Sequence, residues 1–525
     1  MSRIALFQGI DKEGDRYGAP LGIHSIASWV RARGHEADVI DPNIESYLGN
    51  AEPERIILDT LEAKKYDLVG ISSMYFTAPH DFFASHLIKR QFPDMPIIFG
   101  GIEPTFNRED VSRGSLADLI VMGEGEKPTN DIMDIADNLK QRYGRVDSAQ
   151  LRKELNGIKG LYLIDEERKG FFTGARDSLD ADEFREARMN IDYSRIPFDS
   201  YKQAVGKLIV AVTGSNHCPA KCAFCASTNF HEESSGKRPK LHNLSADDLF
   251  SVVKDLVELR PDISTLYFND DNFLYGKRLQ ERAKGYFSKI IDSGMKIPQL
   301  LQSRVDTISY SLLETAFEAG VEMIGYGVEN FSESGLLSLN KRIAVDTIVD
   351  TLDATLEAGI APWSNVILGT PHVDVGGIRD NLQAFMIYWE TGSPIAAYPF
   401  VVPFEGSWYS RNEPYHSDMI RERYTVGDTG ISIERGSRLK VYDSAAEELL
   451  LAAVEKYKPR RDNWVKEVTG MSNLPSYLES GSLAMSILDS AHHLGIDIWG
   501  DTDEIDRFDQ ADIANAFISD DLKYD

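Results

Sequence analysis

Short apolar runs alternate with amphipathic segments along the first part of the chain. The runs have the length of buried strands and end in small or polar residues. The segments between them, such as 21–34 and 80–92, repeat apolar residues every three to four positions, which predicts helices. The predicted strands are 3–10, 36–43, 66–74, 96–101 and 117–126. Repeated strand–helix units of this length predict an α/β fold with a doubly wound parallel sheet, covered by helices on both faces.

A second alternating series fills the middle of the chain. Its predicted strands are 207–214, 264–273, 297–306, 323–330, 361–369 and 395–403. Helical patterns, for example 245–259 and 344–359, separate them. Six strand–helix units predict an open or partial (β/α)6 barrel, in which the chemistry lies at the carboxyl ends of the strands.

Changes in this pattern divide the chain into four parts. A connector with a short hairpin pattern, 146–205, joins the first domain, 1–145, to the barrel, 206–410. The last part, 411–525, is mixed and acidic and contains a long helical pattern, which predicts a small, mostly helical C-terminal domain. A chain of 525 residues is too long for one core, in agreement with this division.

Composition and charge narrow the class of partner. The chain is 42% hydrophobic and 26% charged, which is typical of a folded protein, and its formal net charge is −27. An acidic protein repels phosphate backbones and anionic lipids, so we expect neither nucleic acid nor membrane as a partner. Residues 1–30 lack a secretory pattern, and no apolar run approaches the roughly 20 residues of a membrane helix. We therefore expect a cytoplasmic protein.

Small and polar residues stand where the strands of the first domain end. Ligands of such sheets bind beyond the carboxyl ends of the strands, where the strand order reverses. Glycines there let a backbone approach a bulky ligand, or serve only tight turns, and both interpretations stay open for each glycine. The residues at these ends are Gly9, Ser72, Ser73, Met74, Gly100, Gly101, Gly123, Glu124, Gly125 and Glu126.

All the cysteines of the chain fall in the segment CPAKCAFC, as Cys218, Cys222 and Cys225. An odd number at such tight spacing excludes a disulfide framework. Thiolates are soft ligands that select zinc or iron–sulfur clusters. A zinc site would take His217 or His231 as a fourth ligand. Three thiolates on a four-iron cluster would instead leave one iron open to bind another molecule.

The spacing C-x3-C-x-Phe-C after the first barrel strand, with Phe224 before the third cysteine, resembles the radical S-adenosylmethionine (SAM) enzymes. This resemblance implies that Cys218, Cys222 and Cys225 hold a 4Fe–4S cluster whose open iron chelates SAM. One electron then cleaves SAM to methionine and a 5′-deoxyadenosyl radical, which abstracts hydrogen from a substrate. The resemblance also implies a small-molecule substrate and an external electron donor of the flavodoxin or ferredoxin type.

Other strand ends of the barrel agree with this resemblance. Asp270 and Asp271 stand where the family places a polar group for the SAM amino group, although such a pair also suits a helix cap or a cation. Arg304 suits the SAM carboxylate or a structural salt bridge. In GYGVEN, which resembles the G-x-E segment of the family, Glu329 would accept hydrogen bonds from the ribose. The resemblance also assigns to SAM the residues Phe224, Ser303, Gly327 and Asn365.

The N-terminal segments APLGIHSIASWVRARGHEADVIDPN, YDLVGISSM, PIIFGGIEPT and DLIVMGEGE resemble the Rossmann-like cobalamin-binding domain of cobalamin-dependent radical SAM enzymes. No D-x-H-x-x-G string, which supplies a histidine to cobalt in other cobalamin proteins, occurs. The resemblance therefore implies cobalamin without a histidine ligand, with Met74 or Tyr75 filling its lower face. It adds to the strand-end residues, as cobalamin contacts, Leu21, Tyr75, Ile102 and Glu103.

We consider three functions, of which the first two follow from the resemblance. The first is methylation of an unactivated carbon, in which one SAM methylates cobalamin and a second yields the radical. The second is ring contraction or oxidative cyclisation with the same cofactors. The third is a redox or cobalamin-responsive binding protein whose cluster is structural. Arg304 and Glu329 argue against it, because they stand at the strand ends where the family binds SAM. Aromatic residues near the late strand ends are candidates for a substrate pocket or ordinary core: Trp363, Tyr398, Phe404, Trp408 and Tyr409.

Overall fold

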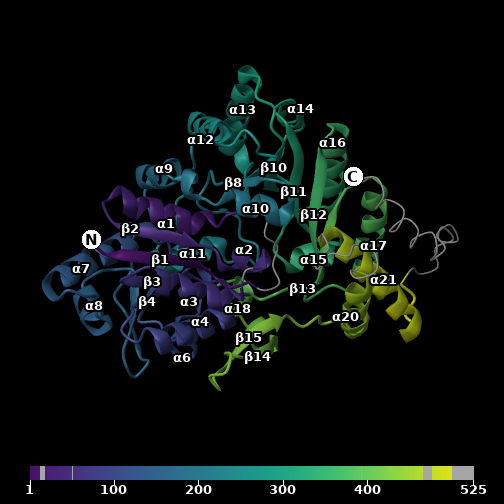
Figure 1. Cartoon of the computed structure of the whole chain (residues 1–525). Helices are drawn as coiled ribbons and strands as arrows, with labels where there is room; N and C mark the ends of the chain where they lie inside the picture. The colour runs from purple at the N-terminus through teal and green to yellow at the C-terminus, as the bar shows by residue number, and fades with distance from the viewer. Residues whose placement is uncertain (12–17, 50, 392, 465–475, 499–525) are drawn as a thin grey trace.

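The computed structural model describes residues 1–11, 18–49, 51–391, 393–464 and 476–498 (Figure 1). Two sheets form its framework, and helices cover them. Both arise where the sequence alternates strand and helix patterns, so the predicted α/β architecture is confirmed. Among the described helices, none has the length and apolar character needed to cross a membrane.

The first sheet has seven strands in the order β2-β1-β3-β4-β5-β6-β7. β1 to β5 are parallel, and the order reverses around β1, as in a doubly wound fold. The hairpin predicted in the connector extends this sheet, because β6 pairs antiparallel with β5. The strands are β1 (Arg3–Gln8), β2 (Glu36–Ile40), β3 (Leu68–Ser72), β4 (Ile97–Gly100), β5 (Leu119–Val121), β6 (Leu161–Ile164) and β7 (Gly170–Phe172).

Helices cover both faces of this sheet because successive strand residues point to opposite sides. Ile4 and Leu6 of β1 pack with α1 and α7, whereas Ala5 and Phe7 pack with α3 and α4. The helices of this part are α1 (Leu21–Ala32), α2 (Pro42–Tyr47), α3 (Pro53–Ala63), α4 (Ala78–Gln91), α5 (Ile102–Phe106), α6 (Arg108–Gly114), α7 (Glu126–Tyr143), α8 (Ser148–Leu155), α9 (Ala181–Met189), the 3-10 turn Tyr193–Arg195 and α10 (Phe198–Val205).

The second sheet is parallel and follows the chain order from β8 to β13, which form its two edges. The predicted partial (β/α)6 barrel is therefore confirmed. Its strands are β8 (Ile209–Val212), β9 (Thr265–Phe268), β10 (Gln299–Arg304), β11 (Val321–Glu329), β12 (Ala361–Gly369) and β13 (Ile395–Phe400). Its helices are α11 (Ser227–Ser235), α12 (Ala246–Leu259), α13 (Gly276–Ser293), α14 (Tyr310–Glu318), α15 (Glu333–Ser338), α16 (Val345–Glu357) and α17 (Val375–Glu390).

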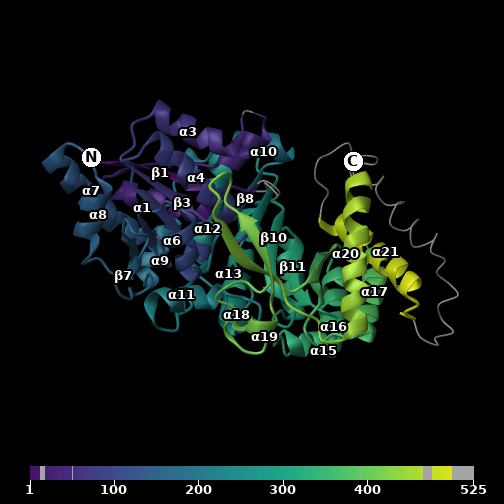
Figure 2. The same ribbon diagram turned by 90° about the horizontal axis from the view of Figure 1, so that it is seen from below.

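The C-terminal part is helical over its later residues, as predicted, but it begins with a hairpin that the pattern did not predict. The antiparallel strands β14 and β15 reach back to the N-terminal domain, where β15 contacts α6 (Figure 2). Val426 and Ile433 of this hairpin enter the core between the first sheet and α4. The elements are α18 (Trp408–Arg411), α19 (Tyr415–Asp418), β14 (Ile420–Thr425), β15 (Ser432–Arg438), α20 (Ser444–Trp464) and α21 (Ser476–Leu494).

Candidate cofactor-binding site

The cysteine segment lies in the loop between β8 and α11, at the carboxyl end of the barrel. All three cysteines are half-buried and line one cavity of about 210 Å³. The loop is held by the segment after α15: the amide of Ala223 donates to the Leu339 carbonyl at 3.0 Å, and the Asn340 side-chain amide donates to the Lys221 carbonyl at 2.7 Å. These bonds keep the three thiols facing the end of the barrel.

Hydrogen-bond donors approach each cysteine sulfur. Arg304 Nη1 lies 3.3 Å from the Cys222 sulfur, the amide of Ser227 lies 3.5 Å from that of Cys225, and Asn272 Nδ2 lies 4.0 Å from that of Cys218. Such donors favour thiolates, which are the form that binds iron. Burial has the opposite effect and raises the pKa of the Cys225 thiol to about 12. Deprotonation of this thiol therefore requires the favourable interaction of the thiolate with a bound metal.

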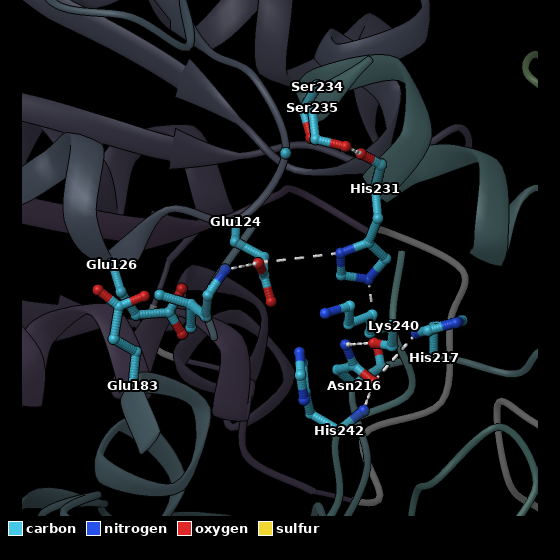
Figure 3. Close-up of polar contacts among 12 residues, drawn as sticks. Glu124, Glu126, Glu183, Asn216, His217, His231, Ser234, Ser235, Lys240 and His242 are labelled. Carbon is cyan, nitrogen blue, oxygen red and sulfur yellow. Dashed lines mark hydrogen bonds and ion pairs between the residues drawn. The ribbon is translucent and has the colours of Figure 1, made fainter. Parts of the chain in front are cut away.

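The two histidines considered as zinc ligands do not line the cysteine cavity. His217 Nδ1 lies 3.0 Å from the Asn216 side-chain oxygen, and His231 Nε2 lies 3.3 Å from the Asn216 carbonyl (Figure 3). Among the described residues, no three His, Cys, Asp or Glu side chains are close enough to share one metal ion. The cysteine cavity is lined by three thiols and by neither histidine, which fits a cluster with one open iron.

Most residues assigned to SAM from the sequence line the cysteine cavity. They are Phe224, Asp271, Ser303, Arg304, Gly327, Glu329 and Asn365. Asp270 does not. It is 1% exposed, accepts hydrogen bonds from the Gly214 amide at 2.7 Å and the Ser215 hydroxyl at 2.5 Å, and faces Arg282 at 3.6 Å. The acidic pair is thus divided: Asp270 holds the loop after β8, and Asp271 faces the cavity.

A buried ion pair forms one wall of the same cavity. Lys341 Nζ lies 2.9 Å from Glu329 Oε1, and the two side chains are 3% and 11% exposed. Glu329 ends β11 in the left-handed region with a φ of 70°, which is unusual for a residue with a side chain. The sequence analysis missed Lys341 because it lies twelve positions beyond Glu329, across α15. Strain at a site-lining residue supports a functional role for this pair.

Arg304 already forms hydrogen bonds and an ion pair within the protein. Its guanidinium contacts Asp306 through Nε at 2.9 Å and Nη2 at 3.0 Å, and Nη2 also donates to the Lys341 carbonyl at 3.1 Å. The structural salt bridge considered from the sequence therefore exists. Arg304 still lines the cavity together with Lys341, so two cations are available there to bind a carboxylate.

A second cavity, of about 390 Å³, lies at the carboxyl ends of β3, β4 and β5. Its volume is within the range of small-molecule sites. The residues assigned from the sequence that line it are Ser72, Gly100, Gly101, Ile102, Gly123, Glu124, Gly125 and Glu126. Gly101 has a φ of 101°, and a Cβ there would lie 2.7 Å from the Ser73 carbonyl. This position requires glycine because of its positive φ and its close approach to the backbone after β3.

Six other residues assigned to cobalamin do not line this cavity: Gly9, Leu21, Ser73, Met74, Tyr75 and Glu103. The hydroxyl of Ser73 donates to buried Asp81 at 2.6 Å. Tyr75 and Glu103 instead bind the C-terminal hairpin. Arg435 of β15 lies 4.2 Å from the Tyr75 ring centre and 2.6 Å from Glu103 Oε1. These two residues therefore join the hairpin to the first domain.

The barrel contributes residues to this second cavity that sequence reasoning missed, including Asn216, Ser227, Phe230 and His231. Asp271 lines both cavities and accepts a hydrogen bond from the Ser227 hydroxyl. The two cavities therefore adjoin at the loop after β9.

A polar cluster joins the two domains at the second cavity (Figure 3). Glu124 accepts a hydrogen bond from the Leu179 amide at 2.7 Å and lies 3.9 Å from His231 Nδ1, which is buried without a hydrogen-bond partner among the described residues. Burial and the charge of Glu126 raise the pKa of Glu124 to about 7. Glu126 is paired with Arg188 at 2.9 Å. Apolar walls with unsatisfied polar groups fit a ligand that carries rings and amides.

The aromatic residues considered as a substrate pocket are dispersed. Tyr409 is fully buried in a small core beside the cysteine loop, and Phe404 packs edge-on against Tyr75 with ring centres 5.3 Å apart. Trp363 is half-buried within β12, and Tyr398 is exposed. Trp408 lines a separate, outer cavity beside the cysteine loop. The structure therefore does not bring these five side chains into one pocket.

Two family models match the chain: the B12 binding domain over residues 14–132 and the radical SAM superfamily over residues 212–384. The chain belongs to the cobalamin-dependent radical SAM enzymes. The first match includes the glycines that line the second cavity, and the second match includes all residues that line the cysteine cavity. The cofactors of this radical SAM enzyme are therefore cobalamin, SAM and a 4Fe–4S cluster.

Relatives of this cobalamin-dependent radical SAM enzyme are distant. "Uncharacterized methyltransferase PH0819" from Pyrococcus horikoshii is 26% identical over 365 residues, which are 67% of this chain and 70% of that protein. "Anaerobic magnesium-protoporphyrin IX monomethyl ester cyclase" from Synechocystis is 22% identical over 61% of this chain and 59% of its own. "Hopanoid C-3 methylase" from Methylococcus capsulatus is 23% identical over 66% and 60%.

Solved structures share the fold. The cobalamin-dependent radical SAM enzyme OxsB with aqua-cobalamin bound aligns with a TM-score of 0.71 at 15% identity, over 99% of this chain and 75% of that chain. The radical SAM methyltransferase TsrM from Kitasatospora setae, with cobalamin and a [4Fe–4S] cluster bound, aligns with a TM-score of 0.63 at 12% identity, over 94% and 100%. These alignments extend over nearly the whole chain, so both domains contribute to the shared fold.

Proposed function

We propose that the enzyme methylates an unactivated carbon of a small molecule. The observation that carries the proposal is that the glycine-lined cavity and the cysteine cavity adjoin at Asp271. When bound, SAM with the cluster supplies a 5′-deoxyadenosyl radical, and cobalamin supplies a methyl group. The adjoining cavities support the transfer of a methyl group between the two sites. The names of two relatives, a methyltransferase and a methylase, agree with it.

The residues of the cysteine cavity have separate roles in this proposal. Cys218, Cys222 and Cys225 hold the cluster. Lys341, with Arg304, binds the carboxylate of SAM, because both cations line the cavity and a carboxylate is the anionic group of SAM. Three further residues bind the rest of SAM: Asp271 the amino group, Glu329 the ribose and Asn365 the adenine side.

The residues of the second cavity bind cobalamin. Gly100, Gly101 and Gly123 line it without side chains, while Glu124 and His231 offer an acid and an imidazole to amide groups at the rim. Among the described residues that line this cavity, the histidine is His231, which belongs to the barrel. The lining residues from the first domain include no histidine. Cobalamin is therefore proposed to bind without a histidine ligand from the first domain.

A second candidate function is oxidative ring closure or ring contraction without methyl transfer. The same cofactors serve both reactions, and one relative is named a cyclase. The mass of the product separates the two functions, because methylation adds one methylene group and ring closure does not.

The proposal is tested by anaerobic reconstitution with iron, sulfide and cobalamin, followed by mass spectrometry of the SAM products. Methylation predicts both S-adenosylhomocysteine and 5′-deoxyadenosine. Cys225→Ala is the matched control, and we expect it to form no 5′-deoxyadenosine while it still binds cobalamin. If 5′-deoxyadenosine forms without S-adenosylhomocysteine and without a methylated product, methyl transfer is wrong.

A further inference from the structure

The C-terminal hairpin, Ile420–Arg438, is anchored in both of the domains that it links. Met419 and Leu439, the residues that precede and follow it, pack in a small core with Ala223 of the cysteine loop. From there the hairpin extends to α4 of the first domain (Figure 2). Its two strands therefore bridge the loop that holds the cysteines and the domain that holds the second cavity.

The tip of the hairpin packs on α4. Val426 and Ile433 are buried in one core with Phe82. Beside them, Arg90 Nη1 and Nη2 lie 3.0 and 2.7 Å from the two carboxylate oxygens of Asp428. An isolated two-stranded hairpin is at most marginally stable in water, so its contacts with the first domain decide whether it stays docked.

Nearer the base of the hairpin, Arg435 binds two side chains of the first domain. Its Nη2 lies 2.6 Å from Glu103 Oε1, and its guanidinium carbon lies 4.2 Å from the centre of the Tyr75 ring. The Tyr75 hydroxyl donates to the carbonyl of Gly436, the next residue of the strand. The side chains of the ion pair are 4% and 3% exposed. β15 therefore holds the loop after β3 through Tyr75 and the start of α5 through Glu103.

Tyr75 and Glu103 belong to the two segments that border the second cavity. Ser72, at the end of β3, and Ile102, at the start of α5, both line this cavity. The two segments also contact each other, because the Glu103 amide donates to the Ser73 carbonyl at 3.4 Å. A movement of Tyr75 or Glu103 away from the hairpin would therefore change the wall of the cavity.

The ion pair alone does little to hold the hairpin in place. Among the described residues, the buried Nε and Nη2 of Arg435 have no hydrogen-bond partner in suitable geometry. A buried ion pair with unsatisfied donors loses much of its Coulomb energy to desolvation. The docked position of the hairpin is thus only moderately favoured, and a ligand that orders the two segments beneath it can shift the equilibrium.

We propose that docking of the hairpin and binding of cobalamin stabilise each other, with Arg435 as the positioning residue. Cobalamin in the second cavity orders the loop after β3 and the start of α5, and these segments hold the docked hairpin. The docked hairpin in turn keeps both segments in the form that binds cobalamin, so the coupling is reciprocal. The coupling rests on the assignment of the second cavity to cobalamin in the proposed function, and it does not depend on methyl transfer.

The test uses the full chain, reconstituted with iron and sulfide, and aquacobalamin as the probe. Equilibrium dialysis gives the dissociation constant, and hydrogen–deuterium exchange reports the docking of β15. Arg435→Met is compared with Arg423→Met. Arg423 pairs with Glu434 of the same hairpin at 2.9 Å, and both side chains are mostly exposed, so this control removes the same charge away from the first domain.

Two further variants separate docking from other effects. Glu103→Gln/Arg435→Met leaves no unpaired charge at the contact, so its neutral side chains can dock again. Val426→Ala weakens the contact of the tip with α4 and changes no charge. Urea unfolding of each variant shows whether it is folded under the conditions of the binding assay.

We expect Arg435→Met to bind aquacobalamin about tenfold more weakly, which corresponds to a docked fraction of about one tenth. The double variant should recover most of this affinity, Val426→Ala should lose about threefold, and Arg423→Met should bind as the wild type does. In the wild type, aquacobalamin at about ten times its dissociation constant should slow the exchange of the β15 amides about tenfold.

Unchanged affinity in folded Arg435→Met overturns the coupling. If that variant does not fold, Val426→Ala and the exchange measurement decide the question in its place. Weak binding that persists in a folded double variant also overturns it, because Arg435 would then contact cobalamin itself. Exchange of β15 that does not respond to aquacobalamin in the wild type has the same consequence. A wild type that binds aquacobalamin but methylates no substrate contradicts the proposed function alone, and the affinities still decide the coupling.

Discussion

Replacement of Lys341 by methionine tests the ion pair in the SAM cavity. The ammonium lies 2.9 Å from Glu329 Oε1, and both groups are nearly inaccessible to solvent. Methionine keeps an unbranched apolar chain of similar size, so the charge is the main thing removed. Loss of one partner of a buried pair costs about 3 to 5 kcal/mol, because the other charge stays buried. Glu329 is slightly more exposed than Lys341, so we expect the lower end, about 3 kcal/mol of unfolding free energy.

The same substitution affects SAM binding. A hydrogen bond to a charged group is worth about 1.5 to 3 kcal/mol, which corresponds to a loss of about ten- to a hundredfold in SAM affinity. Equilibrium dialysis of SAM against the reconstituted, oxidised enzyme measures the affinity, and urea unfolding measures the stability.

A double variant separates the two effects. Glu329→Gln with Lys341→Met leaves no unpaired charge, so we expect most of the stability to return while SAM affinity stays low. Lys296→Met, at an exposed position, serves as the control and should change neither quantity. If Lys341→Met binds SAM as the wild type does and unfolds at the same urea concentration, the reasoning about this pair is refuted.

Three further perturbations address other parts of the molecule. Burial raises the pKa of Glu124 from 4.5 to about 7, so the folded state binds more protons than the unfolded state over this range. Stability is therefore lost as pH rises from 4.5 to about 7, by about 3 kcal/mol. Urea unfolding at several pH values should show this loss in the wild type and not in Glu124→Gln. If the unfolding free energy of both proteins changes equally with pH, the prediction is wrong. Arg435→Met leaves Glu103 buried and unpaired at the hairpin contact, so we expect a loss of about 3 kcal/mol that Arg435→Met/Glu103→Gln largely restores. A loss that persists in the double variant would show that packing dominates there. Cys225→Ala should abolish the cluster absorbance and leave cobalamin binding intact, and loss of both would mean that the loop also supports the second cavity.

The local periodicity of the sequence predicts much of the fold. Most of the parallel strands in the two large sheets are short apolar runs followed by a helical pattern, and both signals act over few residues. The cysteine spacing is equally local, and it locates the cluster loop. The hairpin Ile420–Arg438 was missed because β14 is mostly exposed and carries no apolar run, and its attachment depends on Arg435 meeting Glu103 more than 300 positions earlier.

The less predictable part of the site depends on contacts between distant segments. Lys341 reaches Glu329 only because α15 turns the chain back, and His231 reaches Glu124 only because the two domains meet there. The acidic pair after β9 illustrates the same limit. Asp270 and Asp271 are equivalent in sequence, and the direction of each side chain from the strand end decides that only Asp271 faces the cavities.

The stoichiometry of SAM consumption tests the central claim most directly. The reconstituted enzyme is incubated anaerobically with cobalamin, a reductant, SAM bearing a trideuteriomethyl group, and the small-molecule extract of cells that carry it. We predict that S-adenosylhomocysteine and 5′-deoxyadenosine form in equal amounts and that one small molecule gains the labelled methyl group. Binding of SAM without formation of 5′-deoxyadenosine, in a preparation with its full complement of iron, would contradict the account.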